Sequence, residues 1–282
     1  MSVPSMFRPD LFAGEAALVT GGGTGIGFAV AAELVQLGAN VAICGRRPEP
    51  LADAKAALEA LREGARVYAA PCDIREADAV AAFSDAAAED LGGLQLLVNN
   101  AGGQFPSPAQ HLSPRGFAAV VRNNLFGTWN VTHAVATRHF FPQKRGRIVN
   151  VIANIRRGFP GMAHTGAARA GVENLTKTLA IEWSQFGVRV NAVAPGVIVT
   201  TGTAQYPPAL LVQARRANPL KRLGGAEETG HLIVYLLSPQ ADYITGQTVC
   251  IDGGQSLWGE QWPIPDEGIP AYPPYEVPDV DG

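Results

Sequence analysis

The sequence predicts a single α/β domain built on a doubly wound parallel sheet of seven strands. Apolar, strand-like runs alternate with segments of helical apolar spacing along most of the 282 residues, a pattern typical of parallel sheets joined by helices. The first run, 16–19, ends in a cluster of glycines that leads directly into a helical segment. Hydrophobic residues make up 47% of the chain and charged residues 17%, which indicates a globular core rather than disorder.

Composition excludes several kinds of partner. The formal net charge of −3 gives no reason to expect nucleic acid or an anionic membrane. No apolar run approaches the ~18 residues of a membrane span, and residues 1–10 hold no apolar signal core. The three cysteines lack metal-ligand spacing and fit buried, reduced thiols. The chain ends Asp-Val-Asp-Gly, which is no peroxisomal address, so we expect a cytoplasmic protein without a metal site.

Residues 20–27 read T-G-x-x-x-G-x-G between a strand and a helix expected over 28–37. Gly21 permits a tight turn, Gly25 lets the backbone approach a pyrophosphate, and Gly27 allows the helix to pack closely on the strand. The free N–H groups at the helix start then point at the phosphates. A glycine cluster alone also fits an ordinary loop, so the flanking strand and helix carry the prediction. Two further residues of this turn belong to the predicted site, Thr24 and Ile26.

The second strand, 40–44, is followed by Gly45, Arg46 and Arg47. In an NAD-binding unit, an acidic residue about 20 residues beyond the glycines holds the ribose 2′-hydroxyl; here Gly45 occupies that place. A carboxylate would repel a 2′-phosphate, whereas a guanidinium clasps it through two charge-assisted hydrogen bonds. We therefore predict NADP(H), against the alternative that Arg46 and Arg47 only solvate a loop.

A helix is expected over 51–63 and a third strand over 66–70, with Asp73 and Ile74 just beyond it. Ligands of open α/β sheets bind beyond the carboxyl ends of the strands. Asp73 is therefore placed to accept a hydrogen bond from an adenine amino group, with Ile74 beside the ring. Asp73 fits equally well as the N-cap of a helix over 77–90, and both roles can hold together.

The fourth strand, 94–98, runs into Asn-Asn-Ala-Gly-Gly. Small residues and side-chain amides at a strand end suit close approach of a ribose, so the cofactor contacts are expected to include Asn100, Ala101 and Gly102. Residues 104–106 continue into a loop that would floor a substrate pocket. A long helix is expected over 114–141, and its interior Asn124 is a poor helix former that suggests a special role.

The second half of the chain continues the alternation. A fifth strand is expected over 147–152, a helix over 163–184 and a sixth strand over 188–193. Proline followed by glycine fixes a backbone that makes a good wall for a flat cofactor ring, and this wall is expected to comprise Pro195, Gly196, Ile198 and Thr200.

Residues 201–218 are expected to form two short helices over the pocket, before a helix over 226–237 and a seventh strand ending at Ile251. The domain is predicted to span 1–256. The Pro- and aromatic-rich tail, 257–282, either wraps a neighbouring subunit or frays.

These motifs in this order resemble the short-chain dehydrogenase/reductase family over about residues 12–257: the glycine turn, N-N-A-G at 99–102, Asn124, P-G at 195–196 and I-T-G-Q-x-x-x-x-D-G-G at 244–254. The resemblance implies a Rossmann-type sheet, a nicotinamide cofactor and usually a homotetramer. Residues 102–109 and 164–177 look most similar to peroxisomal trans-2-enoyl-CoA reductases, relatives of the 2,4-dienoyl-CoA reductases, which use NADPH. The missing peroxisomal address suggests a bacterial relative.

The sequence departs from the family at its catalytic positions. The usual chemistry needs a serine after the fifth strand and Tyr-x-x-x-Lys on the next helix, where this chain has Ala153, Thr165 and Arg169. Threonine titrates too high to exchange a proton with a carbonyl, and arginine stays protonated. The ordinary carbonyl-reducing triad is therefore expected to be missing.

Conjugate reduction of an enoyl thioester does not need this triad, because the charge that develops on the thioester oxygen needs only hydrogen-bond donors. Thr165, Asn124 and Asn154 are the candidate donors, and Arg169 would hold the cofactor ribose and add positive potential. In dienoyl-CoA reductases a tyrosine donates from the place that Asn154 occupies here. His164 is a candidate acid because imidazole titrates near neutrality; the alternative is a helix-start histidine facing solvent.

The sequence thus predicts an NADP(H)-dependent reductase acting on the C=C bond of a trans-2-enoyl-CoA or a similar acyl thioester. Two alternatives stay open. One is an alcohol/aldehyde dehydrogenase of the same family, for instance a terpenoid one, and the other is a non-catalytic NADP-binding protein. Arg156 and Arg157 are candidates to bind a CoA phosphate, although a solvated turn explains them equally well.

Overall fold

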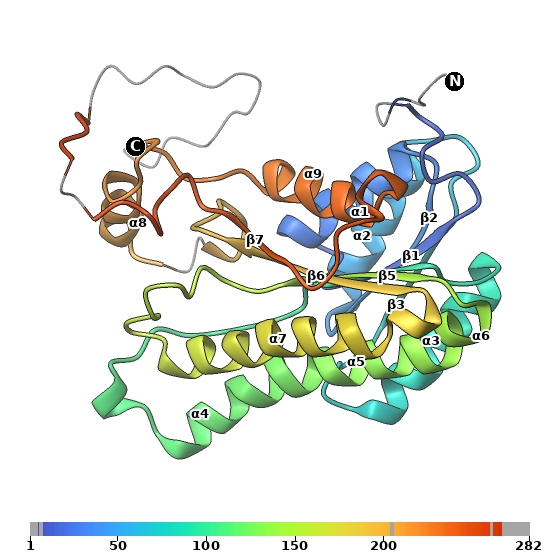
Figure 1. Ribbon diagram of the computed structural model, residues 1–282, viewed down its shortest axis with the longest axis horizontal. Coiled ribbons are helices and arrows are strands. Elements are labelled where there is room, and N and C mark those ends of the chain that lie inside the picture. The colour runs from blue at the N-terminus through green and yellow to red at the C-terminus, as the bar shows by residue number, and fades with distance from the viewer. Residues whose placement is uncertain (1–4, 6–7, 204–205, 260–261, 267–282) are drawn as a thin grey trace.

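The computed structural model describes residues 5, 8–203, 206–259 and 262–266 (Figure 1). Its strands form one parallel sheet in the order β3-β2-β1-β4-β5-β6-β7. They are β1 (Ala16–Thr20), β2 (Asn40–Gly45), β3 (Val67–Pro71), β4 (Leu96–Asn99), β5 (Gly146–Val151), β6 (Val188–Pro195) and β7 (Thr248–Ile251). The predicted doubly wound, seven-stranded single domain is confirmed. The chain reverses its winding between β1 and β4, which is where such sheets open a crevice for ligands.

Helices cover both faces of the sheet (Figure 1). One layer holds α1 (Gly25–Gln36), α2 (Pro48–Glu59) and α9 (Ala226–Leu237). The other holds α3 (Ala77–Leu91), α4 (Pro114–Val121), α5 (Gly127–Val135), α6 (Phe141–Gln143) and α7 (Ala163–Glu182). Successive strand residues point to opposite faces, so Leu18 joins the core under α3 and α5 while Val19 joins the core under α1 and α9.

The helix expected over 114–141 is interrupted twice by a wider π turn, at Arg122–Phe126 and at Ala136–Phe140. In the first, the N–H of Gly127 donates to the carbonyl of Arg122, five residues earlier. The Asn124 side chain donates from Nδ2 to the Val120 carbonyl oxygen at 2.9 Å. The expected long helix is confirmed, but it is not α-helical throughout: Asn124 lies in a π turn of the kind often found at functional sites.

Smaller differences follow from local chemistry. Helix α1 begins at Gly25, three residues before the expected start, because the Phe28 N–H already donates to the carbonyl oxygen of Thr24. Of the two short helices expected over 201–218, α8 (Pro208–Arg216) is present with proline at its first position. It stands apart at one end of the molecule (left in Figure 1), and residues 204–205 lie outside the described residues.

The tail boundary at 257 stays a prediction, because the structure describes only 257–259 and 262–266 of the tail. Those residues form neither helix nor strand.

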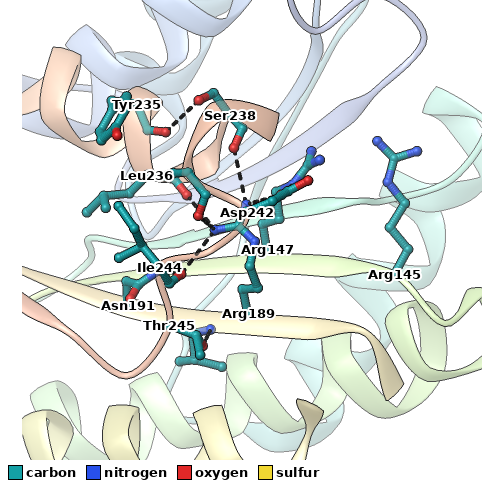
Figure 2. Close-up of polar contacts among 12 residues, drawn as sticks. Arg145, Arg147, Arg189, Asn191, Tyr235, Leu236, Ser238, Asp242, Ile244 and Thr245 are labelled. Carbon is teal, nitrogen blue, oxygen red and sulfur yellow. Dashed lines mark hydrogen bonds and ion pairs between the residues drawn. The ribbon is translucent and has the colours of Figure 1, made fainter. Parts of the chain in front are cut away.

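A cluster of charges ties together the amino ends of β1, β5 and β6 (Figure 2). Arg147 Nη1 lies 2.9 Å from Glu15 Oε2, and Arg189 Nη2 lies 2.8 Å from Asp242 Oδ1. Arg189 Nη1 also donates to three backbone carbonyls of the segment 236–244, at 2.9–3.3 Å. Burial lowers the pKa of Arg189, and the Asp242 carboxylate opposes that shift. This amino-edge cluster links strands β1, β5 and β6 at the edge of the sheet opposite the glycine turn.

Candidate cofactor and active site

The glycine turn has the geometry that its sequence predicts. Gly21 and Gly25 adopt φ angles of +67° and +55°, a region that side chains disfavour. A Cβ atom at Gly27 would lie 2.3 Å from the carbonyl oxygen of Gly21, so no larger residue fits there. The first helical bond of α1 runs from Phe28 N to Thr24 O at 3.2 Å. The amides of residues 25–27 therefore have no intrahelical partner and are available to an anion.

The end of β4 is held directly against this turn. The Thr20 hydroxyl accepts hydrogen bonds from the backbone N–H groups of Asn100 and Ala101, each at 3.0 Å. The Asn100 side chain donates from Nδ2 to the carbonyl oxygens of Thr20 at 3.0 Å and Gly21 at 3.3 Å. The two sequence motifs expected to hold the cofactor thus form one hydrogen-bonded unit.

A cavity of about 470 Å³ opens beside this unit, within the size range of ligand pockets. Most of the predicted cofactor residues line it: Gly21, Thr24, Gly25, Ile26, Arg46, Arg47, Asp73, Ile74, Asn100, Ala101, Gly102 and Thr200. The glycine turn, its free amides and the cavity together fit a dinucleotide, whose pyrophosphate would lie against the amides of residues 25–27.

The remaining predicted wall residues lie elsewhere. Gly196 and Ile198 line a second cavity, of about 110 Å³, rather than the larger one. The carbonyl oxygen of Pro195 accepts a hydrogen bond from the Asn154 N–H at 3.0 Å. The predicted wall is therefore divided, and only Thr200 reaches the large cavity.

Two exposed cations stand at the far end of the large cavity. Arg46 and Arg47 both line it, and neither side chain forms a hydrogen bond or ion pair with any residue that the structure describes. The charge of Arg46 contributes to lowering the pKa of Asp73, after the larger effect of Arg75. Both guanidinium groups are thus available to an anionic group on a bound molecule.

Asp73 has a partner on its own chain segment. Its carboxylate accepts from Arg75 Nε at 2.9 Å and from the Arg75 backbone N–H at 3.0 Å, and these bonds hold the pKa of the carboxyl below its ordinary value. The N-cap position of α3 is Glu76. The alternative role of Asp73 as that cap was therefore wrong, because the cap falls three residues further along the chain and the carboxylate is held by Arg75.

Residues 102–105, which we call the contact loop, bring the catalytic candidates together. A Cβ atom at Gly102 would lie 2.4 Å from Arg169 Nη2. The neighbouring Gly103 accepts from Asn124 Nδ2 at 2.7 Å, and its N–H donates to Asn124 Oδ1 at 3.4 Å. Asn124 thus gives both amide hydrogens to backbone carbonyls, those of Gly103 and Val120. It holds the contact loop on the π turn.

Arg169 is a buried cation without a counter-ion. The residue is buried, with 8% of its surface exposed, and Nη1 donates to the Val151 carbonyl oxygen at 2.8 Å. No carboxylate of the described residues pairs with it, and burial lowers its pKa to about 10. The guanidinium therefore stays protonated at neutral pH, with its positive charge beside Gly102.

The other half of the contact loop reaches two further elements. Gln104 Nε2 donates to the hydroxyl of Tyr206 at 3.2 Å. The ring of Phe105 packs edge-on against His164, with centroids 4.7 Å apart. His164 is completely buried, so the alternative of a solvent-facing histidine was wrong: the Phe105 ring covers it.

Thr165 and Asn154 are already engaged within the protein. The Thr165 hydroxyl lies 3.1 Å from His164 Nδ1, and the Thr165 side chain is fully buried. Asn154 Nδ2 donates to Asp252 Oδ2 at 2.8 Å. That either residue touches a substrate stays a prediction.

Two contributors were missed in the sequence analysis: Thr20 and Tyr206. Thr20 begins the glycine motif, so its position was a usable signal. Tyr206 lies in a segment without periodicity, and its partner Gln104 is 102 positions away. Within the described residues, no group of His, Cys, Asp or Glu side chains is arranged to hold a metal ion, and no helix has the length and hydrophobicity to cross a bilayer.

The chain is similar to several known oxidoreductases. A family model described as "Enoyl-(Acyl carrier protein) reductase" matches residues 21–256. A probable 2,4-dienoyl-CoA reductase of Bacillus subtilis is 39% identical over 86% of this chain and 97% of its own length. A peroxisomal 2,4-dienoyl-CoA reductase of Pongo abelii is 37% identical over 89% of this chain and 87% of its own.

A solved structure extends this likeness to three dimensions. The citronellol catabolism dehydrogenase of Pseudomonas aeruginosa PAO1 is 44% identical, covers 89% of this chain and 99% of its own, and superposes with a TM-score of 0.79. Family members of this reductase type use nicotinamide cofactors, which agrees with the glycine turn and the cavity beside it. The chain belongs to the short-chain dehydrogenase/reductase family.

Proposed function

We propose that the protein is an NADP(H)-dependent reductase of the C=C bond of a trans-2-enoyl-CoA or a similar conjugated acyl thioester. The observation that carries the proposal is Arg169, a buried cation without a carboxylate partner beside Gly102. Such a group cannot relay a proton, but its charge stabilises negative charge that develops nearby. The names of the dienoyl-CoA reductase relatives support the same substrate class.

NADP(H) rather than NAD(H) is proposed from the two arginines after β2. Arg46 and Arg47 line the cavity where a ribose 2′-phosphate would lie, and their hydrogen-bonding groups are not taken up by described residues. A phosphate accepts paired N–H bonds from a guanidinium. Position 45 holds a glycine and not the acidic residue that would favour a ribose 2′-hydroxyl.

In this mechanism a bound dihydronicotinamide supplies the hydride for Cβ of the substrate. The protein's own residues hold the cofactor and polarise the thioester. The amides of residues 25–27 would bind the pyrophosphate, and Arg169 would hold the nicotinamide ribose and place positive potential at the reacting end. Asn124 fixes the contact loop and so keeps Gly102 in close contact with Arg169. The thioester oxygen is stabilised as an enolate by this positive environment.

A second candidate is an alcohol/aldehyde dehydrogenase acting on a terpenoid. The 44% identity to a citronellol catabolism dehydrogenase favours it. The residues at the proton-relay positions, Ala153, Thr165 and Arg169, count against it because none can exchange a proton with a carbonyl at neutral pH. The third candidate is a protein that binds NADP(H) without turnover.

The test is oxidation of NADPH, followed by absorbance, with trans-2-enoyl-CoA and 2,4-dienoyl-CoA substrates. A parallel assay offers NADP⁺ with citronellol and NADPH with citronellal. Turnover with the thioesters supports the first proposal. Turnover only with the alcohol or aldehyde replaces it with the second, and tight NADPH binding without any turnover replaces it with the third.

We also propose a homo-oligomer, with a tetramer as the expected size. Phe117, Phe126 and Trp129, which belong to the helical region 114–135, expose 37–57% of their surface, and clustered exposed aromatics often mark protein interfaces. Light scattering coupled to size-exclusion chromatography tests this.

The CoA phosphate role of Arg157 is not proposed, because its Nη1 donates to the Trp258 carbonyl oxygen at 2.8 Å.

A further inference from the structure

The chain has no tyrosine at positions 154 and 165, from which family members donate a proton, yet a tyrosine from another segment contacts the contact loop. Tyr206 lies two residues before α8, and its half-buried side chain ends at Gln104 of the contact loop. Gln104 Nε2 donates to the phenolic oxygen at 3.2 Å. Because the donor in this bond is the amide, the bond uses a lone pair of the hydroxyl and leaves its hydrogen free.

The hydroxyl hydrogen of Tyr206 has no acceptor within the described part of the chain. A phenol that receives a hydrogen bond but donates none is prepared for proton transfer. The amide of Gln104 stabilises the phenolate that forms when the proton leaves, since an N–H bond to a charged oxygen is stronger than one to a neutral oxygen.

The contact loop links this phenol to the residues beside Arg169. Gln104 follows Gly102 by two residues, which puts their Cα atoms within about 7 Å, and Gly102 contacts Arg169. On the other side, the Tyr206 N–H donates to the Thr203 carbonyl oxygen at 3.0 Å. Thr203 in turn is bonded to Thr200 through its hydroxyl, at 2.7 and 2.9 Å.

Thr200 completes the connection to the cofactor cavity. It lines that cavity, and a Cβ atom at Gly25 would lie 3.2 Å from its side chain. The segment that carries Tyr206 is therefore linked both to the glycine turn and to the contact loop. Either displacement of Gln104 or displacement of Thr200 would move the phenol.

The other described tyrosines lie elsewhere. Tyr68 packs with the core under α3, Tyr235 packs with the core under α9, and Tyr243 is fully exposed on the turn after the amino-edge cluster. The competing donors Thr165 and His164 are completely buried and bonded to each other. Tyr206 thus combines a free hydroxyl hydrogen with a position at the contact loop.

We propose that Tyr206 is the proton donor of the reduction and that Gln104 is its positioning residue, an inference that rests on the proposed function. The enolate formed by conjugate addition uses its electron pair to make a C–H bond at Cα while the Tyr206 O–H bond breaks. The thioester carbonyl reforms as the electrons leave its oxygen. The phenolate, held by the Gln104 amide, then takes a proton from water.

The test compares Tyr206→Phe with Tyr243→Phe, which removes an exposed hydroxyl far from the cavity. Tyr206→Phe is expected to lower kcat by about 100-fold, as removal of a general acid does, while Tyr243→Phe keeps kcat. Both variants should bind NADPH like the wild type in a fluorescence titration. In D₂O, the wild type is expected to place deuterium at Cα in one configuration and Tyr206→Phe in both, read by NMR of the product.

A second, non-kinetic readout is the binding of hexanoyl-CoA in the presence of NADP⁺, measured by calorimetry. Tyr206→Phe is expected to change it less than about twofold, because the phenol acts at Cα and makes no hydrogen bond to the thioester of the product. Gln104→Leu should lower kcat about tenfold, and the double variant should be no slower than Tyr206→Phe alone, since the amide acts through the phenol.

Each outcome has a distinct meaning. If the wild type reduces an enoyl thioester and Tyr206→Phe keeps its kcat, the phenol is not the donor and the proposed function stands. If the losses of Gln104→Leu and Tyr206→Phe multiply in the double variant, the positioning role is wrong. If the wild type reduces no enoyl or dienoyl thioester, the proposed function fails and this inference falls with it.

Discussion

Gly102 and Arg169 approach each other so closely that only a glycine fits: a Cβ atom at position 102 would lie 2.4 Å from Arg169 Nη2 and 2.6 Å from Asn124 Oδ1. Arg169 comes from α7, Asn124 from the π turn after α4 and Gly102 from the loop after β4. The absence of one side chain thus lets three elements meet. The position of the buried cation depends on this contact.

Gly102→Ala should displace the Arg169 guanidinium, because Nη1 of the same group is already fixed to the Val151 carbonyl. We expect a loss of stability of about 1–3 kcal/mol from overpacking, together with weaker NADPH binding and slower turnover. Gly103→Ala is the matched control, since its Cβ atom would meet only Asn123 Nδ2, at 3.2 Å. Thermal unfolding and NADPH titration of both variants check this, and equal effects would contradict it.

Arg169→Met should make the protein more stable and less active. Burial places the pKa of Arg169 at about 10, below that of an unfolded arginine. Below about pH 10 both states are protonated, so the penalty for burying the charge is fully present; it is relieved only as pH rises above the folded pKa. The penalty amounts to about 3 kcal/mol at most, partly offset by the bond to Val151. At pH 7 we expect a Tm increase of about 2–6 °C and loss of turnover.

Arg189→Met supplies the contrast for this prediction. Arg189 is also largely buried, but it pairs with Asp242 at 2.8 Å and donates to several backbone carbonyls of the amino-edge cluster. Removing it leaves the buried backbone acceptors without a donor, which costs about 1–3 kcal/mol. Differential scanning calorimetry should therefore show opposite signs for the two variants. A lower Tm for both would show that the charge of Arg169 is compensated by the protein.

Arg46→Asp should separate the two nicotinamide cofactors. The substitution replaces a free cation at the cavity by a carboxylate that repels a 2′-phosphate. We expect the Kd for NADPH to rise about 100-fold, from loss of a charge-assisted bond, while the Kd for NADH changes little. Arg115→Asp, on exposed surface at the start of α4, serves as the control. Equal losses for both cofactors would rule out the 2′-phosphate role.

The Asp73–Arg75 pair predicts a defined pH dependence of stability. Because Arg75 lowers the pKa of Asp73 in the folded state, the carboxylate contributes stability above its unfolded pKa of about 3.9. That contribution disappears as pH falls through the folded pKa. Asp73→Asn should therefore cost about 0.5–1 kcal/mol between pH 5 and 8, as partly exposed pairs do, and progressively less below pH 4.

Urea unfolding of Asp73→Asn and the wild type across that pH range measures the difference. Asp53→Asn, an exposed aspartate on α2, should show no cost at any pH. A cost for Asp73→Asn that grows on acidification would mean that the pair destabilises the folded state.

The sheet was predictable because its signals are local. Each strand is an apolar run that ends in a polar or glycine-rich turn, and Gly21 and Gly25 announce a left-handed backbone that few residues other than glycine adopt. The ligand edge follows from the parallel order alone. The positions of Thr24, Arg46 and Asn100 on one cavity could therefore be predicted without any contact information.

What could not be predicted depends on contacts between distant segments or on hydrogen bonds with little sequence signature. The bond between Gln104 and Tyr206 joins residues 102 positions apart, in two segments without periodicity. The burial of His164 depends on Phe105, which belongs to another element. Pro195 and Thr200 are only five residues apart, yet only Thr200 reaches the large cavity, because strand β6 ends at Pro195 and the chain changes direction after it.

The π turn at Arg122–Phe126 makes the length of a helix, as well as its sequence, part of the site. One residue of an α-helix corresponds to a rotation of about 100°. A deletion that returned this turn to regular α-helix would therefore rotate Asn124 away from Gly103 without substituting any residue of the site. For this region, an insertion or deletion of one residue is a larger functional change than most substitutions, and homologues of different helix length should differ in how their contact loop is held.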